Sequence, residues 1–190
     1  TEGLLAAVSN AFPGVKLLQT FGTSETGIAK TTSKSSTSTL MKIDPEDTEY
    51  RIVEGELHLR SKTRVLGYLN ASMENFSDDG WYCTGDLVEQ QDDGFLRIVG
   101  RIKELINVGG LKVLPEEVES VLQGIPGVRD SMVFGEKNSI TGQIVVADIV
   151  LAEGADPVEV RSLVRKTCRG RLEAYKVPAK INFVERTNFS

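Results

Sequence analysis

Residues 100–119 read GRIKELINVGGLKVLPEEVE, and the character of the sequence changes within this stretch. A charged segment leads into a double glycine, and Pro115 then opens a helix that has two acids in its first turn and Gly124 just past its end. Proline suits the first helical position because the N–H that it lacks has no partner there. The stretch therefore predicts that a second domain begins at about residue 101.

The residues that follow alternate between strand and helix patterns. The order is strand, helix, strand, strand, helix, strand, which is typical of a small α+β domain over residues 101–190. After the helix that begins at Pro115, the expected elements are a strand Val128 to Phe134, a strand Ile144 to Leu151, a helix from Pro157 capped by Asp156, and a strand Lys180 to Val184.

The residues before 100 show the close spacing of an all-β subdomain. Between Tyr50 and Gly100, turn residues separate the strand-like runs YRIVEGELHLRS, RVLGYLN, DLVEQQ and GFLRIVGR. We expect these runs to form a small barrel-like subdomain within a first domain, residues 1–100, that is the end of a larger domain. The fold class predicted for the whole chain is α+β.

Two other segments complete the first domain. Apolar spacing from Leu4 to Phe12 predicts a helix that Pro13-Gly14 ends, before an extended VKLLQTFG segment. Residues 30–39 are almost all Ser and Thr, and we expect them to form a mobile surface loop. The alternative, a phosphate-cradling loop, is disfavoured because the run contains no glycine.

Composition restricts the function classes. The 190 residues carry a formal net charge of −5, which gives no cationic footprint for nucleic acid, and no apolar run is long enough to cross a membrane. Cys83 and Cys168 stand far apart, outside any CxxC or Cys/His motif, so we expect reduced thiols in a cytoplasmic protein. The opening TEGLLAAVSN reads as the middle of a helix, so we also expect a fragment of a longer protein.

Two motifs have the chemistry of a nucleotide site. FGTSETG, residues 21–27, places a hydroxyl, a carboxylate and open backbone N–H groups together, as a phosphate and its Mg²⁺ require. WYCTGDL, residues 81–87, has an Asp at a strand end that could accept from the hydroxyls of a ribose. Taken singly, each motif is equally compatible with an ordinary turn.

Taken together, the motifs resemble those of a known family. FGTSE, then GELHLR with GYLN, then WYCTGDL, then GRIKELINVGGLKVLPEEVE match in order and spacing the superfamily of acyl-CoA synthetases, luciferases and peptide-synthetase adenylation domains. The resemblance runs from about Phe12 to Glu185. It implies an enzyme that uses ATP to activate a carboxylic acid as its acyl-AMP and then passes the acyl group to a thiol. The acid, such as a fatty or aryl acid, cannot be read from these residues.

The resemblance assigns roles within residues 21–25. Phe21 stands where an aromatic ring packs against adenine, and Gly22 and Thr23 follow it in the nucleotide-binding turn. Ser24 stands at the hydroxyl position that meets the α-phosphate, and Glu25 at the acid that binds Mg²⁺. Phe21 and Ser24 depart mildly from the usual motif, but they keep the stacking face and the hydroxyl.

The later motifs supply the remaining candidates. Asp86 matches the ribose-binding aspartate, and Arg101 the arginine that joins it at the ribose or phosphates. Lys103 falls on the hinge position, near residues 101–103, although a solvated lysine would look the same. Gly109-Gly110 falls on the loop near the pantetheine arm of coenzyme A, although a structural turn explains these glycines equally well. Lys112 follows on the same strand, and we group Lys103 and Lys112 with Ser24 and Glu25 as catalytic candidates.

Some parts of the family pattern lie outside this sequence. The Gly/Ser/Thr-rich phosphate loop is expected upstream of FGTSE, and a catalytic lysine is expected downstream of INFVERTNFS. We therefore expect these 190 residues alone to be inactive in adenylation. Two alternatives stay open: an adenylation module that loads the phosphopantetheine of a carrier protein, and a catalytically silent nucleotide-binding module.

Overall fold

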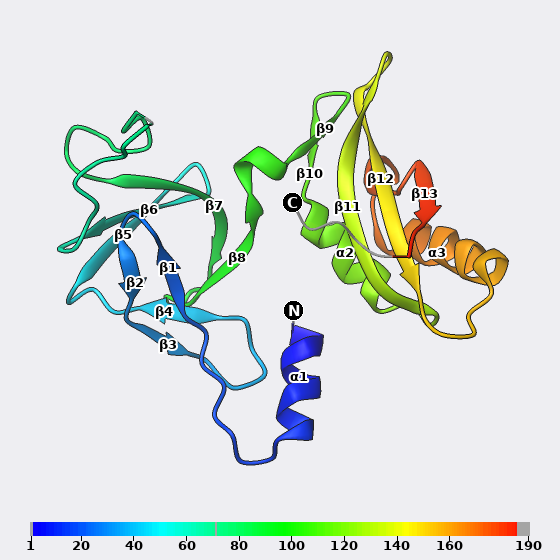
Figure 1. The fold of residues 1–190 in the computed structure, drawn as a ribbon, viewed down its shortest axis with the longest axis horizontal. Helices are drawn as coiled ribbons and strands as arrows, with labels where there is room; N and C mark the ends of the chain where they lie inside the picture. Colours follow the sequence, from blue (N-terminus) through cyan, green and yellow to red (C-terminus); the bar gives the residue numbers. More distant parts are fainter. Residues whose placement is uncertain (1, 71, 186–190) are drawn as a thin grey trace. The chain divides into compact units, whose positions relative to one another are not determined.

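The computed structural model describes residues 2–70 and 72–185 (Figure 1). The chain divides into two compact units, residues 1–102 and 103–190. The division falls within the segment 101–103 that the sequence suggested as a hinge, and movement about it stays a prediction. Among the described residues, no helix combines the length and apolar character that a membrane crossing requires.

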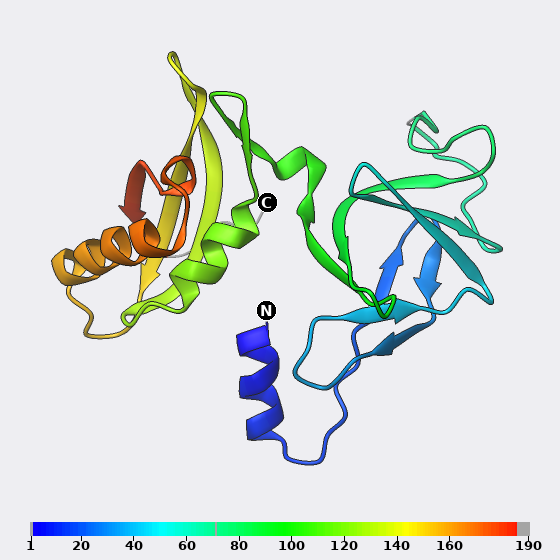
Figure 2. The ribbon, with the colours of Figure 1, turned by 180° about the vertical axis from the view of Figure 1, so that it is seen from behind.

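The first unit begins with one helix and then consists of antiparallel strands (Figure 2). Helix α1 spans Glu2–Ala11, close to the expected bounds. Strands β1 (Phe21–Thr23) and β2 (Gly27–Ala29) form a hairpin, and six further strands form one sheet in the order β3-β4-β8-β7-β6-β5. Their bounds are β3 Thr31–Ser33, β4 Met41–Ile43, β5 Thr48–Val53, β6 Glu56–Ser61, β7 Tyr82–Gln90 and β8 Leu96–Arg101.

The core of the first unit lies against one face of this sheet. Leu57 and Leu59 alternate with polar residues along β6, so both side chains point to the same face and are fully buried. Their neighbours come from the hairpin and from β4, β7 and β8: Phe21, Ala29, Met41, Ile43, Val88 and Leu96.

Two expectations for the first unit are wrong. The Ser/Thr-rich run is not wholly a loop, because Thr31–Ser33 forms the edge strand β3. Hydroxyl groups tie the run to the preceding segment: Ser36 Oγ accepts from the N–H of Leu17, and Thr31 Oγ1 donates to the carbonyl of Gln19. The run RVLGYLN forms no strand, and its Leu66 and Leu69 are fully exposed.

The second unit has the predicted α+β pattern with an added hairpin. A short 3₁₀ turn, η1 (Ile102–Glu104), leads into β9 (Ile106–Val108) and β10 (Leu111–Val113). The remaining elements are α2 Pro115–Gln123, β11 Val128–Asn138, β12 Gly142–Leu151, α3 Pro157–Arg171, the 3₁₀ turn η2 Ala174–Lys176, and β13 Lys180–Phe183. The sheet runs β10-β9-β12-β11, and β13 pairs parallel with β12.

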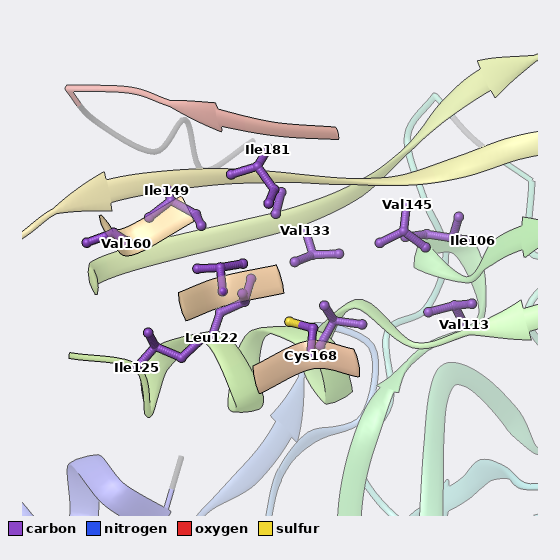
Figure 3. Close-up of a cluster of buried hydrophobic side chains, with 13 residues drawn as sticks. Ile106, Val113, Leu122, Ile125, Val133, Val145, Ile149, Val160, Cys168 and Ile181 are labelled. Carbon is purple, nitrogen blue, oxygen red and sulfur yellow. The ribbon is translucent and has the colours of Figure 1, made fainter. Parts of the chain in front are cut away.

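Both helices of this unit bury one face against the sheet. Leu122 from α2 and Cys168 from α3 meet Val133, Val145 and Ile149 from the strands (Figure 3). The helix starts are those that the sequence predicted. Pro115 opens α2, and the Asp156 side chain caps α3 by accepting a hydrogen bond from the Val158 N–H at 2.8 Å.

Candidate functional site

Asp86, which is buried, forms an ion pair with the half-exposed Arg101 on the neighbouring strand. The antiparallel register of β7 and β8 places the two residues opposite each other, and Arg101 Nε lies 2.9 Å from Asp86 Oδ1. The Asp86 side chain is only 5% exposed, whereas that of Arg101 is 48% exposed. The guanidinium thus compensates a carboxylate that would be costly to bury alone, and it also reaches solvent.

The backbone at Asp86 is held in an irregular stretch of strand. The Asp86 N–H donates to Thr84 Oγ1 at 3.0 Å, and the Thr84 hydroxyl donates to the Leu57 carbonyl at 2.7 Å. Gly85 has a φ of 74°, which favours glycine. The pairing of β7 with β6 is irregular between Cys83 and Leu87, and its pairing with β8 is irregular just after Leu87. Such bulges redirect side chains, and here they set the orientation of Asp86.

Glu25 lies in the turn of the β1-β2 hairpin. Thr23 Oγ1 accepts from the Thr26 N–H at 3.1 Å and closes the turn, while Ser24 at its tip is exposed. Gly22 has a structural reason to be glycine, because a Cβ there would lie 2.9 Å from the Ile28 Cα on the facing strand. The hairpin thus presents the Ser24 hydroxyl and the Glu25 carboxylate from one tight turn.

Two tyrosines connect the turn with strand β7. Tyr68 Oη donates to Glu25 Oε1 at 2.7 Å, and this hydrogen bond is the largest cause of the lowered pKa of Glu25. The pKa of Tyr82 is raised well above its ordinary value, first by burial and then by the negative charge of Glu25, with a smaller contribution from Asp86. The carboxylates of two separate motifs therefore both raise the pKa of the same buried phenol.

The sequence reasoning did not single out Tyr68 or Tyr82. Both stand inside motifs that it quoted, GYLN and WYCTGDL, but neither has a local pattern that would predict contact with Glu25. Phe21, which the family resemblance assigns to packing against adenine, lies in the core of the first unit with 8% exposure. Within the first unit, Asp86 thus pairs with Arg101, and Glu25 and Asp86 both lie close enough to Tyr82 to raise its pKa.

The other predicted residues belong to the second unit. Lys103 is its first residue and lies exposed in η1. Gly109 and Gly110 form the β9-β10 turn with φ values of 61° and 90°, and the Gly110 N–H donates to Asn107 Oδ1 at 2.8 Å. Lys112 is exposed on β10.

A surface hollow lies beside the double glycine. Its volume is about 710 Å³, and Asn107, Gly110, Lys137, Thr141 and Gln143 are among the residues that line it. The residues around it are mostly of polar types, and one of them is a glycine.

Comparison with known proteins gives consistent results. Residues 117–188 match the family model of the AMP-binding enzyme C-terminal domain. A long-chain-fatty-acid–CoA ligase of Mycobacterium tuberculosis is 39% identical over 136 residues, which cover 70% of this chain and 26% of that protein. The chain therefore spans about a quarter of the length of that relative.

Solved structures match over almost the whole chain. ATP-bound MatB from Rhodopseudomonas palustris gives a TM-score of 0.85 at 26% identity, covering 100% of this chain and 40% of that one. The o-succinylbenzoate CoA synthetase of Bacillus subtilis, in complex with its acyl-adenylate intermediate, gives 0.75 at 25% identity, covering 98% of this chain and 41% of that one. Both of these relatives were thus captured with an adenine nucleotide or an acyl-adenylate.

Proposed function

Because the chain belongs to the adenylate-forming superfamily of AMP-binding enzymes, we propose that it is part of an ATP-dependent carboxylic acid–CoA ligase. The observation that carries the proposal is the Asp86–Arg101 pair. Glu25 supports it, because the charges of Glu25 and Asp86 both raise the pKa of the buried Tyr82. A buried carboxylate with a half-exposed guanidinium suits a ligand that offers hydroxyl donors and an anionic phosphate side by side. A nucleotide has both.

Asp86 would bind the ribose. An ionised carboxylate offers about four acceptor positions on its two oxygens, and Arg101 Nε lies against one of these oxygens. Vicinal ribose hydroxyls can donate to the carboxylate, and Arg101 has further N–H groups for the ribose or the phosphates. The fixed backbone at Gly85 and Thr84 keeps Asp86 in place before the ligand arrives.

The residues of the β1-β2 turn suit a magnesium–phosphate complex. Glu25 is ionised at neutral pH, as an ordinary glutamate is, and its lowered pKa keeps it so in more acidic solution. Mg²⁺ prefers such hard oxygen ligands, while it keeps waters and phosphate oxygens at its other positions. When bound, Mg²⁺ disperses negative charge on the phosphates. The exposed Ser24 hydroxyl would donate to the α-phosphate, and Gly22 and Thr23 hold the turn that presents it.

The reaction proceeds in two displacements. A carboxylate oxygen of the acid attacks the α-phosphorus of ATP, the new O–P bond forms, and pyrophosphate leaves with the electrons of the broken bond. The sulfur of a thiol then attacks the acyl carbon and loses its proton to solvent, the C–S bond forms, and AMP leaves with the electrons of the broken acyl C–O bond. Asp86 and Arg101 serve both steps by holding the nucleotide in line, because accurate positioning supplies much of the rate enhancement in such reactions.

The second unit would serve the thiol step. Lys103 would act as the hinge about which this unit turns between the two half-reactions, as lids and domains do in other enzymes. Gly109 and Gly110 would let the pantetheine arm of coenzyme A pass close to the backbone, next to the 710 Å³ hollow, with Lys112 on the adjoining strand. We favour coenzyme A over a carrier protein as the acceptor because several relatives that match more than half of the chain are CoA ligases by name.

Acid-dependent exchange of pyrophosphate into ATP tests the proposal. The full-length protein that carries these residues should exchange with at least one member of a panel of fatty and aryl acids, and Asp86→Asn should reduce the rate. Release of AMP should then require free coenzyme A. The 190 residues by themselves should not exchange, whichever acid is offered. Absence of exchange with every acid, together with absence of AMP binding, would favour a catalytically silent module.

A further inference from the structure

Glu56, His58 and Cys83 lie together on β6 and β7, two neighbouring strands of the first unit's sheet (Figure 1). The register of the two strands places His58 directly opposite Cys83. Glu56 stands two residues before His58, so strand alternation puts its side chain on the same face. Leu57 and Leu59, which point to the other face, belong to the core of the first unit.

His58 lies between the acid and the thiol. Its Nε2 is 3.3 Å from Glu56 Oε2, and its Nδ1 is 3.9 Å from Cys83 Sγ. One donor atom from each of the three residues lies within 4.8 Å of the other two. The imidazole is buried, with 8% of the residue exposed, so the three donors are gathered in a partly desolvated place.

The charges around this cluster leave it negative when its acid groups are ionised. Arg51 stands opposite His58 on β5, but its guanidinium stacks on the Trp81 ring at 4.4 Å and pairs with Asp79 at 3.6 Å. Asp79 therefore offsets the charge of Arg51. The carboxylate of Glu56 and a thiolate at Cys83 would then add two negative charges, which one divalent cation would neutralise.

We propose that Glu56, His58 and Cys83 form a binding site for a divalent transition-metal ion, and that Zn²⁺ is the best match. Thiolate, imidazole and carboxylate are the three ligand types that Zn²⁺ accepts, whereas Mg²⁺ avoids sulfur. An ion at the centre of the donor triangle lies no more than about 2.8 Å from each donor, against Zn²⁺ bond lengths of about 2.0 to 2.3 Å. Shifts of about 0.5 to 0.8 Å by the side chains would complete the coordination. The imidazole would also have to turn, so that one ring nitrogen faces an ion held by both Glu56 and Cys83.

Binding replaces the thiol proton with the metal. The Cys83 S–H bond breaks, its proton goes to solvent, and Sγ ligates the ion, while the fourth coordination position stays open to water or another ligand. The site is separate from the proposed magnesium position at Glu25 and does not depend on the proposed ligase function. The ion would join β6 to β7, and β7 is also the strand that carries Asp86.

Metal titration of the full chain tests this inference. In calorimetry, one Zn²⁺ should bind per chain, and Cys83→Ser or His58→Gln should weaken binding by at least about 100-fold, with a smaller loss for Glu56→Gln. Cys168→Ala is the matched control, because Cys168 is buried in the core of the second unit and should leave the affinity unchanged. Equal affinity in wild type and Cys83→Ser would overturn the proposal.

Two further measurements keep the test decisive if a variant folds poorly. Co²⁺ bound to the wild-type chain should show the absorption of a thiolate-to-cobalt transition, and Zn²⁺ should slow alkylation of Cys83, read out by peptide mass spectrometry, while excess Mg²⁺ should not. A cobalt spectrum without the thiolate band, or alkylation of Cys83 at the same rate with and without Zn²⁺, would show that the ion does not bind here.

Discussion

Tyr68 Oη donates a hydrogen bond to Glu25 Oε1 at 2.7 Å, which links a residue of the irregular segment before β7 to the turn of the first hairpin. The bond stabilises the ionised form of Glu25 and lowers its pKa, and the same interaction raises the pKa of Tyr68. A carboxylate that stays charged and is held by a phenol is well suited to bind a cation.

Tyr68→Phe should raise the pKa of Glu25 towards its ordinary value, because the largest cause of the lowering is removed. Carboxyl NMR titration of Glu25 measures this directly. Because the pKa of Glu25 is lower in the folded state than in the unfolded state, where it is near 4.5, its ionisation stabilises the fold at pH values above 4.5. This stabilisation is lost as the pH falls through the pKa of the folded state. The free energy of unfolding by which wild type exceeds Tyr68→Phe should therefore decrease below about pH 4.5.

Tyr50→Phe is the control for this titration. Tyr50 Oη accepts from Gln90 Nε2 at 3.3 Å and is not among the groups that shift the pKa of Glu25. If both variants shift the pKa of Glu25 equally, the hydrogen bond from Tyr68 is not the cause of the lowered pKa.

Glu119→Gln should stabilise the second unit at neutral pH. Burial raises the pKa of Glu119, whose Oε1 accepts from the Val133 N–H at 2.7 Å, and glutamine keeps that acceptor without the charge. Because the folded pKa lies above the unfolded one, wild-type stability falls as pH rises through the interval between them. In urea unfolding, Glu119→Gln should be more stable than wild type at pH values above that interval. Below the interval, this difference in stability should vanish. Glu153→Gln, at an exposed turn, should show no such pH dependence.

Asp156→Ala should reduce stability by about 1 kcal/mol, since the helix loses its N-terminal cap. The carboxylate accepts from the Val158 N–H at 2.8 Å, and alanine leaves that donor to water. Amide hydrogen exchange in the first turn of α3 should accelerate. Asp156→Ser, which can still cap, should recover most of the loss, and an equal loss in both variants would argue against the cap.

Arg101→Met should destabilise the first unit by about 2 kcal/mol, because it leaves the buried Asp86 carboxylate without its guanidinium. The double variant Asp86→Asn with Arg101→Met should lose less than the sum of the single changes. Trp81 is the single tryptophan and lies in the first unit, so its fluorescence reports this unfolding. Strict additivity would show that the two side chains do not interact.

Much of the fold could be predicted because its signals are local. The starts of α2 and α3 follow from Pro115 and Asp156, whose effects act within one helical turn. The segment 64–70 misled the prediction, because its apolar residues resemble a strand pattern, yet Leu66 and Leu69 point to solvent. A pattern of apolar residues does not reveal whether a partner strand is present.

The site could be predicted only where a motif marks it. Asp86, Arg101 and Glu25 stand in motifs whose order matches that of the adenylate-forming superfamily. In contrast, the contact of Tyr68 with Glu25 depends on tertiary structure, and the pairing of His58 with Cys83 depends on strand register. Register near Asp86 shifts at two irregularities, and no local rule fixes where such shifts occur.

Calorimetric titration of the full-length protein with AMP tests the central claim, that Asp86 binds the nucleotide ribose. Asp86→Asn should weaken AMP binding by about 10-fold or more, because the amide replaces a charged acceptor. Asp92→Asn, the same change at an exposed position in the same hairpin, should bind like wild type. Wild-type affinity in a folded Asp86→Asn variant would contradict the account.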